Sequence, residues 1–147
     1  MASDGTRLIG LWFDGQHYFA DSLSSSPTER PDLPVFNLVR AWLDTYFSGQ
    51  EPSITPPLHL RGSDFRKRVW SLLLTIPYGH TMTYGEIARR LGCQSAQAVG
   101  GAVGHNPISL IIPCHRVIGS DGSLTGYAGG LDKKEWLLKM EGCTRIF

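Results

Sequence analysis

Two short helices joined by a glycine-containing turn are the sequence feature that most limits how this chain can fold. Residues Thr83-Tyr84-Gly85-Glu86 have the capping-box pattern, in which a hydroxyl group and a carboxylate satisfy the first free backbone N–H groups of a helix. This helix is expected to stop at Gly92, and Ser95 can cap a second helix over residues 96–104. The pair predicts a helix-turn-helix.

Apolar residues at helical spacing predict three further helices. The first is expected to be capped by Asp32 and to end near Gly49. The second is expected to be capped by Ser63 or Asp64 and to end near Thr75, and the third to be capped by Asp132 and to cover residues 133–141. Short apolar runs predict strands. These are Leu8 to Phe13, a return strand over Gln16 to Phe19, Ile108 to Ile112, and Val117-Ile118 before a hairpin at Gly119 to Gly122.

These elements predict an α+β protein with two domains. Residues 1–57 form a small N-terminal α/β domain, a sheet plus a helix, that ends in a proline-rich linker. Residues 58–147 form a mostly helical, winged-helix-like domain that contains the helix-turn-helix.

Charge, cysteine spacing and hydropathy limit which partners, metal sites and cell compartments fit this chain. The formal net charge is only +1, so any nucleic-acid contact must come from a local patch or from uncharged groups. Arg66, Lys67 and Arg68 are the one dense basic cluster, which is either a solvated face or a site for an anionic partner. The three cysteines have no metal-site or disulfide spacing, which predicts a reducing, cytoplasmic compartment and no bound metal. No run approaches the ~20 apolar residues of a membrane span.

Pro113-Cys114-His115-Arg116 places a thiol beside an imidazole at the end of an apolar run. A thiolate is a strong nucleophile, and a nearby histidine can help to form it at neutral pH. Neighbours in an extended chain point to opposite faces, so Cys114 and His115 need not touch directly, and a water can link them. His115 then needs an orienting group, for which Glu141 is a candidate. The alternative is that a buried cysteine lies next to a histidine by chance.

The second helix of the helix-turn-helix is nearly bare. It contains Gly100, Gly101 and Gly104, although each glycine costs a helix about 1 kcal/mol relative to alanine. A recognition helix for the major groove carries long polar side chains. The glycines therefore favour either close approach to a narrow groove or tight packing against another helix.

Residues 63–142 resemble the O6-alkylguanine-DNA alkyltransferases, also called methylated-DNA–protein-cysteine methyltransferases. The resemblance rests on motifs in the family's order and spacing. They are Ile76-Pro77-Tyr78-Gly79, Thr83 to Ala88, Ala98-Val99-Gly100, Asn106-Pro107, Ile111 to Gly119, Gly126 to Gly130, Lys134 to Leu138 and Glu141-Gly142.

The resemblance implies a single-turnover repair reaction in which a flipped O6-alkylguanine gives its alkyl group to Cys114. The partner is double-stranded DNA bound in the minor groove by a monomer, and no cofactor is implied. The implied catalytic residues are Cys114 as acceptor, His115 as activator, Glu141 as its orienting group, Asn106 in the active-site turn and Tyr84 near the 3′ phosphate and the departing base. Tyr127, Gly129, Gly130 and Val117 would bind the substrate, and Ala96, Gln97, Gly100, Gly101, Arg66, Arg116 and Ser120 would contact DNA.

The sequence departs from the family pattern in two places. Gln97 stands where many members have the arginine that fills the gap left by the flipped base. The chain begins within what would be the family's second N-terminal strand, so either the sheet is smaller or the start is clipped.

Three other functions are consistent with parts of the sequence. A module that binds alkylguanine without repairing it would have a different residue, typically tryptophan, in place of Cys114. A cysteine hydrolase would leave the helix-turn-helix unexplained. A transcription regulator would need a second domain for which this chain is too short.

Overall fold

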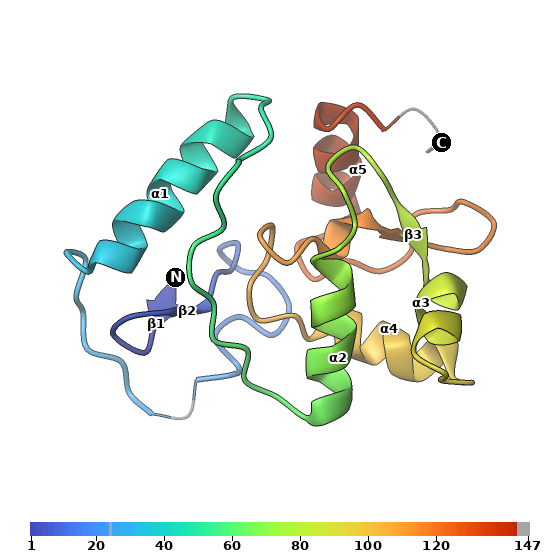
Figure 1. Ribbon diagram of the computed structural model, residues 1–147, viewed down its shortest axis with the longest axis horizontal. Helices are drawn as coiled ribbons and strands as arrows, with labels where there is room; N and C mark the ends of the chain where they lie inside the picture. The colour runs from blue at the N-terminus through green and yellow to red at the C-terminus, as the bar shows by residue number, and fades with distance from the viewer. Residues whose placement is uncertain (24, 144–147) are drawn as a thin grey trace.

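The computed structural model describes residues 1–23 and 25–143, and it places a small N-terminal part beside a larger, mostly helical C-terminal part (Figure 1). Strands β1 (Ala2–Ser3) and β2 (Leu8–Gly10) form an antiparallel two-stranded sheet, and helix α1 (Pro34–Phe47) follows. The predicted α+β fold, with a small N-terminal sheet and a helical second part, is confirmed.

The C-terminal part is built around the predicted pair of short helices. Its elements are α2 (Asp64–Leu73), β3 (Met82–Thr83), α3 (Tyr84–Arg90), α4 (Ala96–Gly104), the 3-10 helix η1 (Cys114–Arg116), β4 (Val117–Ile118) and α5 (Leu131–Met140). Strands β3 and β4 pair in parallel, and η1 leads directly into β4 while β3 leads directly into α3. This pairing fixes η1 close to the start of the helix-turn-helix.

The predicted helix caps of the helix-turn-helix are confirmed. The amide of Glu86 donates to Thr83 Oγ1 at 3.1 Å, and the amide of Thr83 donates to Glu86 Oε2 at 2.7 Å. Ser95 Oγ accepts from the amide of Ala98 at 3.0 Å, which starts α4. Gly92 ends the first helix with φ of +65°, a conformation that favours glycine.

Helix α4 packs against α2 and α3 through one face only. Val99, Ala102 and Val103 are buried on that face, and the indole N–H of Trp70 in α2 donates to the Ala102 carbonyl at 2.8 Å. A buried indole N–H needs such a partner, so this bond fixes the position of α4 along α2.

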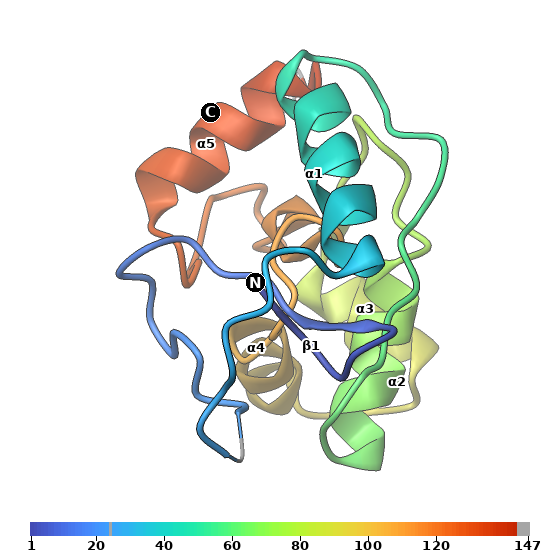
Figure 2. The same ribbon diagram turned by 90° about the vertical axis from the view of Figure 1, so that its left-hand side faces the viewer.

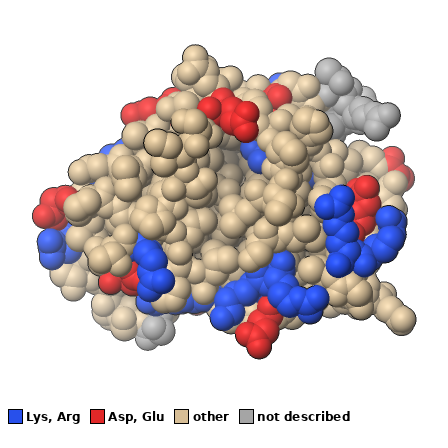
Figure 3. Space-filling model, in the orientation of Figure 1, with Lys and Arg blue, Asp and Glu red and all other residues tan. Residues whose placement is uncertain are grey.

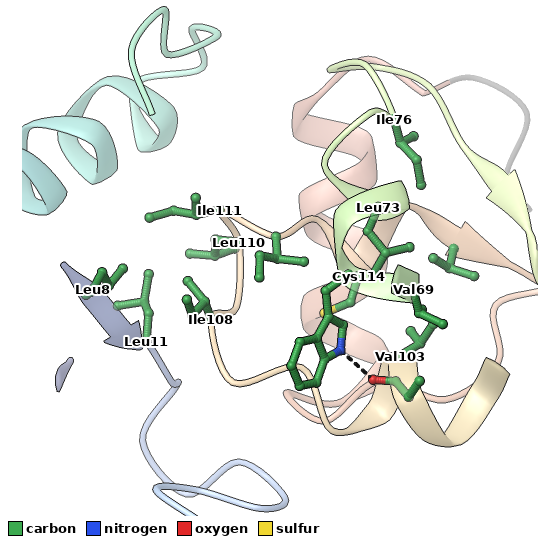
Figure 4. Packing of buried hydrophobic residues seen from close by; sticks show 14 of the residues in the cluster. Leu8, Leu11, Val69, Leu73, Ile76, Val103, Ile108, Leu110, Ile111 and Cys114 are labelled. Atoms are coloured by element: carbon green, nitrogen blue, oxygen red, sulfur yellow. Dashed lines mark hydrogen bonds between the residues drawn. The ribbon is translucent and has the colours of Figure 1, made fainter. Parts of the chain in front are cut away.

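One hydrophobic core joins the two parts of the molecule. Leu8 and Leu11 from the N-terminal segment lie against Ile108 from the C-terminal part, and the cluster continues to Cys114 (Figure 4). Backbone bonds reinforce this contact: the Leu11 amide donates to the Pro107 carbonyl at 2.9 Å, and the Ser109 amide donates to the Leu11 carbonyl at 2.8 Å. The N-terminal segment therefore supports the turn that precedes Cys114.

A second contact joins α1 to α5. The rings of Phe47 and Trp136 lie 6.2 Å apart, and the end of α1 approaches α5 in both views (Figures 1 and 2). Tyr46, at the same end of α1, is completely buried. Trp136 itself is 55% exposed, and the buried face of α5 consists of Lys134, Leu137 and Leu138. No helix in the described ranges combines the length and the apolarity needed to cross a membrane.

Two predicted strands are wrong. Residues Gln16 to Phe19 form successive turns instead of a return strand, because the Gln16 side chain accepts from the Phe13 amide at 2.8 Å and closes a turn. Ile108 to Ile112 also form a turn, in which Leu110 has φ of +71°. This run is apolar because it is buried, and short apolar runs do not distinguish a strand from another buried segment.

Three predictions of local detail are also wrong. Asp32 and Asp132 do not cap their helices, since α1 begins after Leu33 and α5 after Gly130, and neither helix has a side-chain cap. The residues after β4 make a turn closed by the Gly119 amide and the Ser123 carbonyl at 2.9 Å, but no return strand follows. Strand β4 pairs with β3 instead of with a hairpin partner.

Candidate active site

Cys114 lies at the first position of η1, at the end of the buried turn formed by residues 108–113. Its side chain is a free thiol, and the residue is 5% exposed. The chain is helical at this point, so the extended geometry predicted for Cys114 and His115 is wrong. The turn places one buried sulfur within the core that joins both parts of the molecule (Figure 4).

Asn106 closes the turn that carries Cys114. Its Nδ2 donates to the Ile112 carbonyl at 2.8 Å, and its Oδ1 accepts from the Ile108 amide at 2.9 Å. The side chain is buried, so these two bonds hold the turn in a region without competing solvent.

His115, Glu141 and Arg116 form a buried polar cluster beside the thiol. His115 Nε2 lies 3.1 Å from Glu141 Oε1, and Arg116 Nε lies 3.0 Å from both Glu141 oxygens. Arg116 also donates through Nη1 to the Ile76 carbonyl at 2.7 Å. The family resemblance implied that Arg116 contacts DNA. Its guanidinium group instead points inward to Glu141, which leaves it no free face for a phosphate.

The ionisation states of this cluster follow from its hydrogen bonds and its burial. Burial alone would raise the pKa of Glu141, but hydrogen bonds from His115 and Arg116 lower it to about 2. Burial lowers the pKa of His115, although Glu141 opposes this shift. At neutral pH the cluster therefore contains an ionised Glu141, a charged Arg116 and a neutral His115.

The hydrogen bonds also select one tautomer of His115. A carboxylate only accepts hydrogen bonds, so the ring nitrogen that faces Glu141, Nε2, carries the proton. The lone pair is then on Nδ1, which is buried and has no hydrogen-bond partner among the described residues. Nδ1 is the basic atom available to the thiol.

Lys134 is a site residue that the sequence reasoning missed. Its side chain is completely buried, and Nζ donates to the carbonyls of Thr125 at 2.9 Å and Gly126 at 3.1 Å. Burial lowers the pKa of Lys134 to about 8, and its charge favours the thiolate of Cys114. Burial nevertheless raises the pKa of Cys114, while a hydrogen bond from Asn106 opposes the rise. The resting thiol needs a base.

A signal for Lys134 was present in the sequence. Lys134, Leu137, Leu138 and Glu141 are spaced as one face of a helix. Because Leu137 and Leu138 are buried, the two charged residues of that face are carried into the interior as well. No comparable signal marked Tyr46. It lies among the apolar residues of α1 at helical spacing, and its hydroxyl group contacts His115 and Glu141.

A pocket of about 270 Å³ leads to Cys114. Its lining comes from five places: the start of α3, helix α4, the start of η1, the loop before α5, and the N-terminal segment. The lining residues are His17, Tyr18, Tyr84, Gly100, Val103, Gly104, Cys114, Gly126, Tyr127 and Ala128. His17 and Tyr18 were not predicted to belong to the site.

The other residues predicted to bind the substrate have different places. A Cβ on Gly129 would lie 2.8 Å from the ring of Tyr127, so this glycine lets the Tyr127 ring pack closely. Gly130, with φ of +99°, precedes the first residue of α5. Val117 is buried in β4 and does not line the pocket.

The glycines of α4 face open space. A Cβ placed on Gly100, Gly101 or Gly104 would meet no atom outside the helix's own backbone within 4 Å. The alternative that these glycines permit tight packing against another helix is therefore wrong. Ala96, Gln97 and Gly101 are exposed on this side of α4, as is Ser120 beyond β4. Figure 3 shows Lys and Arg side chains beside α2 and α3 on one face of the molecule, and Arg66 belongs to α2.

The described residues contain no group of three His, Cys, Asp or Glu side chains that could hold a metal ion. The described residues around Cys114 include the imidazole of His115, the buried ammonium group of Lys134, and Tyr18, Tyr84 and Tyr127 in the pocket lining.

Comparisons with known proteins agree with this arrangement. Two family models match: the ribonuclease-like domain of 6-O-methylguanine DNA methyltransferase over residues 1–60, and its DNA binding domain over residues 64–143. A Mycobacterium tuberculosis protein named methylated-DNA–protein-cysteine methyltransferase is 53% identical over 112 residues, 76% of this chain and 68% of that protein. A protein of the same name from Haemophilus influenzae is 42% identical over 95% of this chain and 77% of its own length.

Solved structures give the same result. The crystal structure of M. tuberculosis OGT in complex with DNA matches with a TM-score of 0.84 and 45% identity, over 99% of this chain and 86% of that one. S. pombe Atl1, in complex with DNA that contains O6-carboxymethylguanine, matches 56% of this chain and 79% of its own with a TM-score of 0.50. The chain therefore belongs to the 6-O-methylguanine DNA methyltransferase family.

Proposed function

We propose that this protein repairs O6-alkylguanine in DNA by transferring the alkyl group irreversibly to Cys114. The observation that carries the proposal is the shared pocket: one cavity joins the Cys114 thiol to the glycine face of α4. Membership of the methyltransferase family supports the same reaction. The pocket brings together a nucleophile, a DNA-facing helix and aromatic walls, which a flipped base requires.

The first chemical step is removal of the thiol proton. His115 Nδ1 accepts the proton of Cys114 through a water molecule, which gives a thiolate and an imidazolium. Glu141, whose carboxylate lies 3.1 Å from Nε2, stabilises the new positive charge. Asn106 and Lys134 favour the thiolate.

The second step is a displacement at the alkyl carbon. The thiolate forms the new S–C bond while the C–O6 bond breaks, and guanine leaves with the bonding electrons. Tyr84, in the pocket lining, donates a proton to the departing base. The proton that His115 accepted from Cys114 restores the proton of Tyr84, so His115 returns to its neutral form. The product is a thioether on Cys114. Thioethers do not hydrolyse under these conditions, so each molecule acts once.

The same proposal includes the mode of DNA binding. Helix α4 enters the minor groove, because its glycines let the backbone approach closely and long side chains are absent from its pocket face. Ala96, Gln97, Gly100 and Gly101 would face the groove, and Arg66 and Ser120 would contact the backbone. Arg116 is not part of the proposed DNA contact, because its guanidinium group is buried against Glu141. The domain boundary at residue 57, the monomeric state and the cytoplasmic location stay predictions, and residues 144–147 of the second domain lie outside the described part.

Two rival functions make different predictions. A hydrolase that used Cys114 and His115 would turn over many times. A recognition module, such as the one expected when the cysteine is replaced, would bind alkylated DNA without changing it. The presence of Cys114 beside a basic histidine argues against the recognition module.

Intact mass measurement separates these functions. After incubation with DNA that contains O6-methylguanine, the protein should gain about one methylene in mass, once per molecule. The gain should disappear in Cys114→Ala and persist in Cys93→Ala, which removes a cysteine outside the pocket. Tight binding without a gain would favour the recognition module, and multiple turnover would favour the hydrolase.

A further inference from the structure

Helix α1 supplies one side chain to the buried cluster beside Cys114. We infer that Tyr46 is a positioning residue for the proposed alkyl transfer: its hydroxyl group holds His115 with the proton on Nε2 and favours the imidazolium that forms when Cys114 loses its proton. The inference rests on the proposed function. It would give the N-terminal part of the molecule a direct role in the reaction of the C-terminal part.

The contacts of Tyr46 carry this inference. Its hydroxyl oxygen lies 3.1 Å from Glu141 Oε1 and 3.2 Å from His115 Nε2, and His115 Nε2 lies 3.1 Å from the same carboxylate oxygen. The three groups form a closed triangle. Tyr46, His115 and Glu141 are all buried, with exposed fractions of 0%, 0% and 6%.

The direction of each hydrogen bond follows from the ionisation states. Burial raises the pKa of Tyr46, and the negative charge of Glu141 raises it further, so the phenol keeps its proton. Ionised Glu141 only accepts, so the Tyr46 O–H donates to it. The Tyr46 oxygen then presents its lone pairs to His115, and the Nε2–H of His115 donates to the oxygens of Glu141 and Tyr46.

This arrangement changes the energy of proton transfer from Cys114. The negative end of the hydroxyl dipole faces Nε2–H, and it interacts more strongly with an imidazolium than with a neutral imidazole. The proton that leaves the sulfur arrives on Nδ1, and the resulting positive charge is spread over a ring whose Nε2–H is held by two oxygens. Removal of the hydroxyl therefore disfavours the thiolate–imidazolium pair.

Other ionisable groups surround His115, and the effect of Tyr46 adds to theirs. Glu141 favours the imidazolium, while the positive charges of Arg116 and Lys134 oppose it. The remaining titratable groups near the cluster are Cys114, Cys143, Tyr78 and Tyr127. Among the described residues, the His115 ring forms hydrogen bonds with the side chains of Glu141 and Tyr46.

The test is the pH dependence of single-turnover methyl transfer in Tyr46→Phe, which keeps the ring and removes the hydroxyl. One neutral hydrogen bond predicts a roughly three- to tenfold slower transfer at neutral pH. The apparent pKa of the thiol, measured with iodoacetamide, should rise by about half to one pH unit, since tenfold corresponds to one unit. Above that pKa the rates of variant and wild type should converge.

Tyr78→Phe is the matched control. Its ring packs edge-on against Tyr46, and its hydroxyl donates to the Gly49 carbonyl at 3.3 Å instead of to the His115 cluster. The control should keep the wild-type pH profile. An unchanged profile in Tyr46→Phe, or a rate loss of equal size at every pH, would overturn the inference.

A measurement on the wild-type protein tests the inference even if Tyr46→Phe folds poorly. The nitrogen-15 chemical shifts of His115 should show the proton on Nε2 in the neutral ring, and a proton on Nδ1 would contradict the proposed geometry. The wild type also separates the two proposals. Absence of methyl transfer in the wild type refutes the proposed function, whereas transfer that is equally fast in Tyr46→Phe refutes only the role of Tyr46.

Discussion

Lys134 has an ammonium group in the interior, where it binds two carbonyls of the loop before α5. A buried cation is costly unless it is paired, and this one has no carboxylate partner among the described residues. The two loop carbonyls are the polar partners that partly offset this cost. The residue therefore shapes the pocket at some expense of stability.

Lys134 should make the stability of the protein depend on pH. Its pKa is about 8 in the folded protein and 10.5 in an ordinary lysine, so the unfolded chain binds the proton more tightly between these values. Stability attributable to Lys134 should then rise as the pH increases from about 8 to 10.5, by roughly 2 to 3 kcal/mol. Denaturant unfolding of wild type and Lys134→Met at several pH values measures this difference.

Lys133→Met is the matched control for that experiment, because Lys133 is the exposed neighbour in α5. It should retain the wild-type dependence on pH. A parallel pH dependence in wild type and Lys134→Met would show that Lys134 is not the group responsible.

Helix α4 is unusual among the elements of this molecule because one of its faces is made of glycine. Its other face packs against α2 and α3, and its N-terminus is capped by Ser95. This packing offsets the low helix propensity of the glycines, since short helices in proteins are stabilised mainly by tertiary contacts. The helix is thus stable without large side chains on the side that would face DNA.

Gln97 is the exposed position of α4 at which the family often has arginine. Gln97→Arg should increase DNA affinity and make binding more sensitive to salt, with a change of slope of about one charge. Titration of labelled duplex DNA at several salt concentrations measures both effects. Unchanged affinity together with an unchanged rate of alkyl transfer would show that the residue at this position does not matter here.

At the scale of the whole molecule, the N-terminal part contributes to the site from two directions. Tyr46 reaches the buried cluster from α1, and the segment around Tyr18 forms one wall of the pocket. Tyr18 stacks between His17 and His105, with 3.9 Å between ring centroids on each side. The His17 amide also donates to the Ala128 carbonyl at 3.0 Å, which ties this wall to the loop on the other side.

The wall formed by Tyr18 should limit the size of the alkyl group. Tyr18→Ala should raise the rate with O6-benzylguanine DNA relative to O6-methylguanine DNA by roughly tenfold, the lower end of what one pocket contact provides. Phe19→Ala, at an exposed position outside the pocket lining, should leave the ratio unchanged. Single-turnover rates on paired oligonucleotides give the ratio, and an equal ratio in all three proteins would remove Tyr18 from the specificity wall.

The local elements that were predictable share a physical cause. The capping box at Thr83 and the cap at Ser95 are interactions within four residues of chain, so the sequence contains all their partners. The failures at Gln16 to Phe19 and at Ile108 to Ile112 have a different cause. Each turn is closed by a local side-chain bond, from the Phe13 amide to Gln16 Oε1 and from the Ile108 amide to Asn106 Oδ1. Contacts between the two segments, such as the 3.2 Å bond from Ser109 Oγ to Gln16 Oε1, hold both turns in place, and no local pattern records such contacts.

The sequence by itself determined the helix-turn-helix, the family and the prediction of Cys114 as the alkyl acceptor, because these depend on short motifs and their spacing. Only the tertiary structure added Tyr46, Lys134 and Tyr18 to the side chains around the thiol. Tyr46 and Glu141 are separated by 95 positions, and they meet at His115 because α1 packs across the end of α5. Arg116 turned inward for the same reason, since the buried carboxylate of Glu141 requires a cation. Contacts of this range are set by packing, which no local pattern records.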